Sequence, residues 1–201
     1  MARQKRALPE ECDIKCRLAD VSLKLFAERG YAATSVREIV KEAGVTAPVL
    51  YYYFGSKEGV YLTIMEQALN HLRSLLATVV EEALPAREKI VRLAREILLL
   101  HESYPDLTRV VYAVFYGPPQ GAPHFDFTEL HTGLLSAMER LVSDGVRAGD
   151  FEPGSESAAS WAILGAVYMA IEAELNQPGR ISPEYGIDRI LEIIFRGIAK
   201  A

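Results

Sequence analysis

The residues best suited to chemistry in this sequence are a run of three tyrosines, Tyr51 to Tyr53, that follows Thr46, Ala47 and Pro48. Successive residues on an α-helix point about 100° apart, so three consecutive tyrosines cannot all be buried and at least one must be exposed. An exposed tyrosine offers a hydroxyl that binds phosphate and a ring that contacts the methyl group of thymine. The run therefore indicates contact with nucleic acid, whereas a plain surface helix hairpin would leave these aromatic residues unexplained.

Two short helices must position these residues. Ser35 and Glu38 have the spacing of a capping box, which marks the start of a helix, and Gly44 ends that helix after about two turns. Thr46 can cap the next short helix, whose inner residues include Leu50. The spacing predicts a helix-turn-helix over about residues 35–54. The outward face of its second helix carries Thr46, Ala47, Pro48, Tyr51 and Tyr52.

Helical patterns cover nearly the whole chain. A longer helix is predicted from Ser56 to about Ala83, and further helical stretches of about 12 to 25 residues follow between turns rich in proline and glycine. Strand alternation and internal repeats are not evident. We therefore predict an all-α fold of about nine helices, with a boundary near residue 56 between a domain of three short helices over residues 1–56 and a domain of longer helices over residues 57–201.

Charge and composition restrict the classes of function. The chain has 22 Lys and Arg against 27 Asp and Glu, but residues 1–60 carry 10 basic and 8 acidic side chains. An acidic chain does not coat nucleic acid non-specifically, so DNA binding must come from a local patch. No stretch approaches the roughly 20 uncharged apolar residues of a membrane span, so we expect no membrane partner. Cys12 and Cys16 are expected to be free thiols in a reducing cytoplasm.

The main alternatives are a helical enzyme and a protein-binding helical adaptor. The sequence has no Gly-x-Ser-x-Gly motif and no glycine-rich phosphate loop. Its four histidines lack the His-x-x-x-His spacing of a metal site. We therefore expect no catalytic residues, no metal and no cofactor, although a Ser/His/Asp set assembled in space stays open.

The segment from Leu25 to Tyr61, LFAERGYAATSVREIVKEAGVTAPVLYYYFGSKEGVY, resembles the TetR family of bacterial transcriptional repressors. The match covers roughly residues 10–65, and beyond it only the helical layout and an Ala-Gly-Asp-Phe turn are similar. The resemblance implies a DNA-binding domain over residues 1–56 and an effector-binding and dimerisation domain over residues 57–201. It implies a cytoplasmic homodimer that binds a double-stranded DNA operator. It also implies repression that is released by a small-molecule effector, and it leaves activation open.

Carried over position by position, the resemblance implies contacts with DNA. Thr34 and Ser35 would hold a phosphate, Arg37 would reach a phosphate or a base, and Lys57 would pair with a phosphate. The start of the recognition helix would enter the major groove. Because Ala47 and Pro48 offer no side-chain donor, base recognition would depend on Thr46, Arg37, apolar contacts and DNA shape. The implied DNA-binding set is Thr34, Ser35, Arg37, Thr46, Ala47, Pro48, Tyr51, Tyr52 and Lys57.

The last two helical segments are candidates for a dimer interface. The final segment has one broad apolar stripe, and the segment before it interleaves large apolar residues with alanine and glycine. These faces could be buried within one subunit or against a second copy in a four-helix bundle, and the resemblance favours the second copy. The candidate interface residues are Leu164, Val167, Ile171, Ile187, Ile190, Leu191, Ile194 and Phe195.

An effector pocket is expected among the helices that follow residue 56. Aromatic residues border proline-rich turns there, and Glu172 stands on an otherwise apolar helix, where a carboxylate needs an arginine, the dimer mate or a cationic ligand as partner. Each candidate alone fits a core position as well. The candidates are His71, His101, Tyr112, Phe115, Tyr116, His131, Met138, Trp161, Tyr168, Met169 and Glu172.

Overall fold

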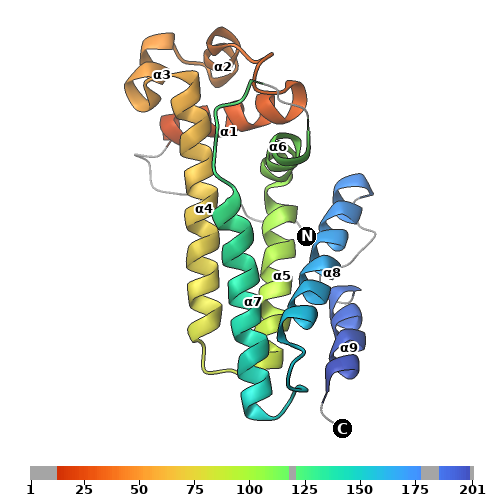
Figure 1. Cartoon of the computed structure of the whole chain (residues 1–201). Coiled ribbons are helices and arrows are strands. Elements are labelled where there is room, and N and C mark those ends of the chain that lie inside the picture. The colour runs from red at the N-terminus through yellow and green to blue at the C-terminus, as the bar shows by residue number, and fades with distance from the viewer. Residues whose placement is uncertain (1–12, 118–120, 178–185, 200–201) are drawn as a thin grey trace, which may run out of the picture. The chain divides into compact units, whose positions relative to one another are not determined.

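The computed structural model describes residues 13–117, 121–177 and 186–199, and these residues form nine helices (Figure 1). The helices are α1 (Asp13–Arg29), α2 (Val36–Ala43), α3 (Ala47–Phe54), α4 (Lys57–Glu81), α5 (Ala86–Ser103), α6 (Pro105–Tyr116), α7 (Thr128–Ala148), α8 (Glu156–Asn176) and α9 (Gly186–Ile198). Within the described ranges the β-structure is limited to one isolated bridge, between Phe151 and Ala199. The predicted all-α fold is confirmed.

The chain divides into two compact units. Unit 1 comprises residues 1–68 and 106–125, and unit 2 comprises residues 69–105 and 126–201. The boundary expected at residue 56 falls between α3 and α4, whereas α4 itself contributes its first 12 residues to unit 1 and the remainder to unit 2. Nearly all of α6 belongs to unit 1, although it follows α5 of unit 2 in the chain.

The core of unit 1 forms where α1, α2 and α3 pack against one another. Each of these helices contributes a fully buried aliphatic side chain: Leu18 from α1, Ile39 from α2 and Leu50 from α3. Tyr61 of α4 is equally buried, and its ring packs edge-on against Phe26 at a centroid distance of 6.2 Å. Burial of these apolar side chains is what fixes the angle between the two short helices of the helix-turn-helix.

Unit 2 is a helical layer in which α7 and α8 pack on each other and on α5, and α9 packs on α8 and α5. Gly145 of α7 is required there, because a Cβ would lie 2.3 Å from the Phe151 ring. That ring stacks on Phe195 of α9 at 5.7 Å. Exposed ion pairs from Arg95 to Asp188 and from Arg87 to Glu192 also join α5 to α9.

Two sequence expectations need correction here. Cys16 is held in a disulfide, so the expectation of a free thiol is wrong for it, and Cys12 lies outside the described residues. The second expectation is that no stretch approaches the length and composition of a membrane span. Helix α8 is long and apolar enough to cross a membrane by these two criteria. It nevertheless carries Glu172 and Glu174 and buries Ile163 and Val167 within unit 2, as a core helix does.

Candidate DNA-binding site

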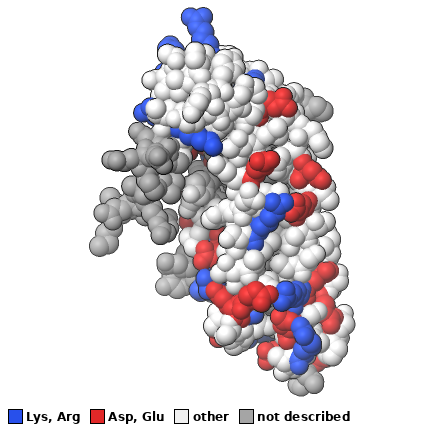
Figure 2. Space-filling model, turned by 90° about the vertical axis from the view of Figure 1, so that its left-hand side faces the viewer, with Lys and Arg blue, Asp and Glu red and all other residues white. Residues whose placement is uncertain are grey.

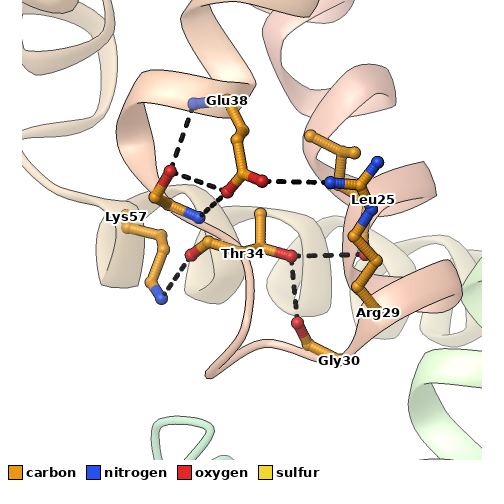
Figure 3. A network of polar contacts seen from close by, with 7 residues as sticks. Leu25, Arg29, Gly30, Thr34, Glu38 and Lys57 are labelled. Carbon is orange, nitrogen blue, oxygen red and sulfur yellow. Dashed lines mark hydrogen bonds and ion pairs between the residues drawn. The ribbon is translucent and has the colours of Figure 1, made fainter.

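A network of polar contacts fixes the start of α2 (Figure 3). The Ser35 hydroxyl accepts the backbone N–H of Glu38 at 3.2 Å, and the Glu38 carboxylate accepts the backbone N–H of Ser35 at 2.8 Å. The predicted capping box is therefore confirmed. Arg29 at the end of α1 donates to the same carboxylate at 3.0 Å, so one glutamate ties two helices together. Hydrogen bonds from Ser35, and then the charge of Arg29, lower the pKa of Glu38 below its usual value.

The turn between α2 and α3 depends on Gly44. Its φ of +66° lies in the left-handed region, where a glycine is not strained by a Cβ, and its N–H donates to the carbonyl oxygens of Lys41 and Val40. Thr46 then occupies the N-cap position of α3, but its hydroxyl makes no cap hydrogen bond. The N-cap position was therefore predicted correctly, but the Thr46 hydroxyl does not accept a hydrogen bond from a backbone N–H of the first turn of α3.

The solvent face of α3 is aromatic and uncharged. Tyr52 is 82% exposed and Tyr51 is 50% exposed, and Pro48 and Thr46 are exposed beside them. The Tyr52 ring rests edge-on against Tyr53 at 5.0 Å. In Figure 2 the upper part, where α2 and α3 lie in Figure 1, is mostly free of charge and has Lys and Arg at its margin. Large apolar side chains gathered on a surface mark a contact with a partner.

Thr34 does not have the role that the resemblance implied for its side chain. It is only 1% exposed, and its hydroxyl donates to the carbonyl oxygen of Gly30 at 2.9 Å and to that of Leu25 at 3.3 Å (Figure 3). The hydroxyl therefore closes the turn after α1 and does not face a phosphate. Ser35 is exposed, but its hydroxyl is engaged in the capping box, where it also donates to Glu38 at 2.7 Å.

Lys57, at the first residue of α4, also points into the protein. Its ammonium donates to the carbonyl oxygen of Thr34 at 2.8 Å and to that of Tyr31 at 2.9 Å, and it lies 4.0 Å from the centre of the Tyr31 ring. Burial lowers the pKa of this amine. Arg37, in contrast, is exposed on α2 and forms no ion pair with any residue that the structure describes.

The candidate pocket residues fall into both units. Tyr112, Phe115 and Tyr116 of α6 belong to unit 1 and pack ring against ring. The other eight belong to unit 2, where His131 of α7 stacks on Tyr168 of α8 at 6.2 Å. Met138 is fully buried and His101 is partly buried. The exposed members of the whole candidate set are His71, Phe115, Tyr116, Trp161, Met169 and Glu172. In residues 13–117, 121–177 and 186–199 no group of His, Cys, Asp or Glu has the arrangement of a metal site.

The candidate dimer residues are mostly internal. Six of the eight are buried in their own subunit: Leu164, Val167, Ile171, Ile187, Leu191 and Phe195. These six add no area to an interface, and only Ile190 and Ile194 are partly exposed. The large exposed apolar side chains of α8 and α9 are instead Trp161, Met169 and Ile193. Ile193 was missed because it lies outside the apolar stripe of the last helix, and the stripe was the only signal that the sequence analysis used there.

Comparison with known proteins identifies the family. The family model of tetR-type bacterial regulatory proteins matches residues 18–64, which contain the whole helix-turn-helix. The chain belongs to the tetR family. This regulator is 26% identical over 189 residues to the transcriptional repressor KstR2 of Rhodococcus jostii (strain RHA1), covering 90% of this chain and 89% of the relative. It is 20% identical over 182 residues to the fatty acid metabolism regulator protein of Bacillus subtilis (strain 168), covering 90% and 93%.

Solved structures share the fold of this regulator. The transcriptional regulator FadR from Bacillus subtilis, in complex with stearoyl-CoA, superposes with a TM-score of 0.69 at 19% identity, covering 92% of this chain and 99% of that one. A TetR-like regulator from Rhodococcus sp. RHA1 gives 0.72 at 18% identity, covering 95% and 98%. The protein is a DNA-binding transcriptional regulator and not an enzyme, so the catalytic and adaptor alternatives are set aside.

Proposed function

We propose that α3 lies in the major groove of an operator with its exposed tyrosine face toward the DNA. The observation that carries this proposal is that Tyr51 and Tyr52 project from a helix whose own packing does not need them. Thr46, with no cap hydrogen bond, brings a hydroxyl to the N-terminal end of α3, and Ala47 and Pro48 bring apolar surface there. A recognition helix reads base edges with residues at its N-terminal end, which is where these three lie.

The absence of charge on α3 restricts how bases are read. The helix APVLYYYF contains no Arg, Lys, Asn or Gln, which are the side chains that make bidentate contacts with guanine or adenine. Arg37 is exposed on α2, the helix that packs on α3, and supplies a guanidinium for a phosphate or a guanine. We expect operator positions facing α3 to be rich in thymine, because its methyl group suits contacts with apolar side chains, and to depend on groove shape elsewhere.

The operator is tested with DNA from upstream of the regulator's own gene. Fluorescence anisotropy at several salt concentrations should give specific binding whose affinity falls steeply with salt, as phosphate contacts require. Scrambled DNA of the same composition is the control. Equal affinity for both DNAs would refute sequence-specific recognition by α3.

A homodimer brings two copies of α3 to one operator. The exposed face of α8 carries Trp161 and Met169, which are 65% and 63% exposed, and α9 carries Ile193 at 67%. A Cβ added at Gly165 or Gly197 would meet nothing within 4 Å, so packing inside the subunit does not explain these helical glycines. Glycine weakens a helix by about 1 kcal/mol relative to alanine, and a close approach by a second copy of α8 and α9 supplies the reason to keep it.

The interface proposed here therefore uses the outer faces of α8 and α9 and not the buried stripe. Ile190 and Ile194 are the members of the sequence-based set that remain in it. A twofold dimer bound to DNA reads two half-sites about 34 Å apart, so the operator should be a near-palindrome.

The dimer is tested by the variant Gly165→Arg, which puts a long charged side chain on the outer face of α8 at a position where an added Cβ meets nothing within 4 Å in its own subunit. Analytical ultracentrifugation should show a monomer with unchanged helix content and a loss of operator binding. Ala77→Arg, at an exposed position of α4, is the matched control and should remain dimeric. A dimeric Gly165→Arg protein would refute this interface.

The effector is proposed to be an acyl-CoA thioester, acting in the cytoplasm where the operator lies. Support comes from the relatives, because a fatty acid metabolism regulator matches this chain and FadR has been solved with stearoyl-CoA. An effector lowers operator affinity only if it binds the DNA-free conformation more tightly than the DNA-bound one. Helix α4 offers the physical link, since it is one continuous helix with residues in both units.

Acyl-CoA thioesters of short, medium and long chain should be titrated into the operator complex, with free coenzyme A as the control. Release of DNA by one chain-length class and not by coenzyme A is expected. Unchanged operator affinity across the series would remove acyl-CoA as the effector.

A further inference from the structure

Lys57 has a set of contacts that the recognition of DNA does not explain. Its ammonium bonds two carbonyl oxygens and faces one aromatic ring, and all three belong to the turn between α1 and α2. Both hydrogen bonds are shorter than 3 Å and link residues 23 and 26 positions apart in the chain. A charged donor gives stronger hydrogen bonds than a neutral one, so these contacts are expected to contribute more than an average pair.

The ring of Tyr31 is held from more than one side. Lys57 lies over it at 4.0 Å, and Tyr61 packs edge-on against it at 5.4 Å with an interplanar angle of 70°. Residues four apart on a helix share a face, so Lys57 and Tyr61 are successive turns of the same side of α4. Phe26 of α1 completes the contact at 5.3 Å. The first two turns of α4 thus hold the turn after α1.

This turn leads directly into the helix-turn-helix. Thr34, whose carbonyl oxygen accepts from Lys57, is buried and precedes Ser35, the N-cap of α2 (Figure 3). Helix α2 in turn packs on α3, with Ile39 and Leu50 both fully buried. A change in the placement of the first turn of α4 is therefore passed through Thr34 to α2 and to the tyrosine face of α3.

We infer that Lys57 is a positioning residue that holds the helix-turn-helix against α4, and that it does not bind a DNA phosphate. The inference rests on the proposed contact of α3 with the operator. It replaces the role implied by the family resemblance, because two of the three N–H donors of the ammonium already bond the carbonyl oxygens of Tyr31 and Thr34, and the ring of Tyr31 lies 4.0 Å from it. It also identifies the point at which a change in α4 reaches the DNA-contacting helices.

Two measurements on Lys57→Met separate the two roles. The first is the slope of log operator affinity against log salt concentration, which becomes shallower by about 0.9 for each phosphate that the protein no longer neutralises. A positioning role predicts a loss of affinity of roughly tenfold or more with little change in slope. The matched control is Lys24→Met, which removes the same charge from an exposed position of α1 in the same unit and reports the general effect of charge.

The second measurement needs no DNA. Hydrogen–deuterium exchange of the free protein should be faster in residues 30–36 of Lys57→Met, and unchanged in Lys24→Met. If Lys57→Met fails to fold, Tyr31→Leu provides the test, because it removes the ring beside Lys57 without a change in charge. Tyr31→Leu should lower operator affinity at the wild-type slope, and Tyr31→Phe, which keeps the ring, should not.

A slope shallower by about 0.9 relative to Lys24→Met would overturn the inference, since it shows that the wild-type ammonium neutralises one phosphate. Unchanged exchange in residues 30–36 would overturn it as well. Failure of the proposed function gives a different result, because the wild-type protein itself would then bind no operator. The exchange measurement on the free protein would still decide whether Lys57 holds the turn after α1.

Discussion

Replacing Thr34 with valine separates a structural hydroxyl from a DNA-binding one. The side chain keeps its shape, but its hydrogen bonds to the carbonyl oxygens of Gly30 and Leu25 are removed. A typical buried hydrogen bond contributes about 1 kcal/mol, and a buried carbonyl left without its donor costs about 1–3 kcal/mol. Thr34 is only 1% exposed, and its bond to Leu25 is buried, so water has little access to that carbonyl oxygen. We therefore expect the free energy of unfolding to fall by about 1–3 kcal/mol.

The assay is urea unfolding followed by circular dichroism, together with operator affinity at fixed salt. Thr46→Val is the matched control, because Thr46 is exposed and its hydroxyl makes no cap hydrogen bond. The two variants should give reciprocal results, with Thr34→Val losing stability and Thr46→Val losing operator affinity at unchanged stability. If Thr34→Val kept its stability and lost affinity, its hydroxyl would face DNA and our assignment would be refuted.

Three other side chains give predictions of their own. Tyr52→Ala should weaken operator binding and leave both the dimer and the unfolding midpoint unchanged, because the ring is 82% exposed; a monomer in ultracentrifugation would contradict this. Tyr61→Phe should keep or raise stability in urea unfolding, since among the described residues its buried hydroxyl has no hydrogen-bond partner, and a clear loss would reveal one. The pKa of Glu38 is lowered in the folded state, so its contribution to stability is present above about pH 4.5 and is lost as the pH falls through the folded pKa. Unfolding midpoints between pH 7 and 3 should therefore converge with those of Glu38→Gln at low pH, and parallel curves would contradict this prediction.

The DNA-binding helices could be predicted largely from the family resemblance and from local spacing. Ser35 and Glu38 are three residues apart, Gly44 ends α2, and the three tyrosines occupy consecutive positions, so each of these features depends only on the geometry of one helix and its ends. The all-α fold could be read in the same way, because helical periodicity and turn residues are local properties of the chain.

Only the tertiary structure decided what Thr34 and Lys57 do. The sequence offers a hydroxyl and an ammonium near a DNA-binding helix, and both suit a phosphate. Their actual partners are carbonyl oxygens in the turn after α1, and Lys57 reaches that turn from 23 and 26 positions away. No local pattern encodes such a distance, because it depends on how α4 packs on that turn.

The same distinction applies to α8 and α9. Their apolar composition determined that they must be covered, but Val167 and Leu191 are covered by their own subunit, whereas Trp161 and Ile193 are not. The hydrophobic effect is non-directional and depends on the apolar area that is removed from water. The sequence therefore determines how much apolar surface must be buried, and the packing of the helices determines which neighbour buries it.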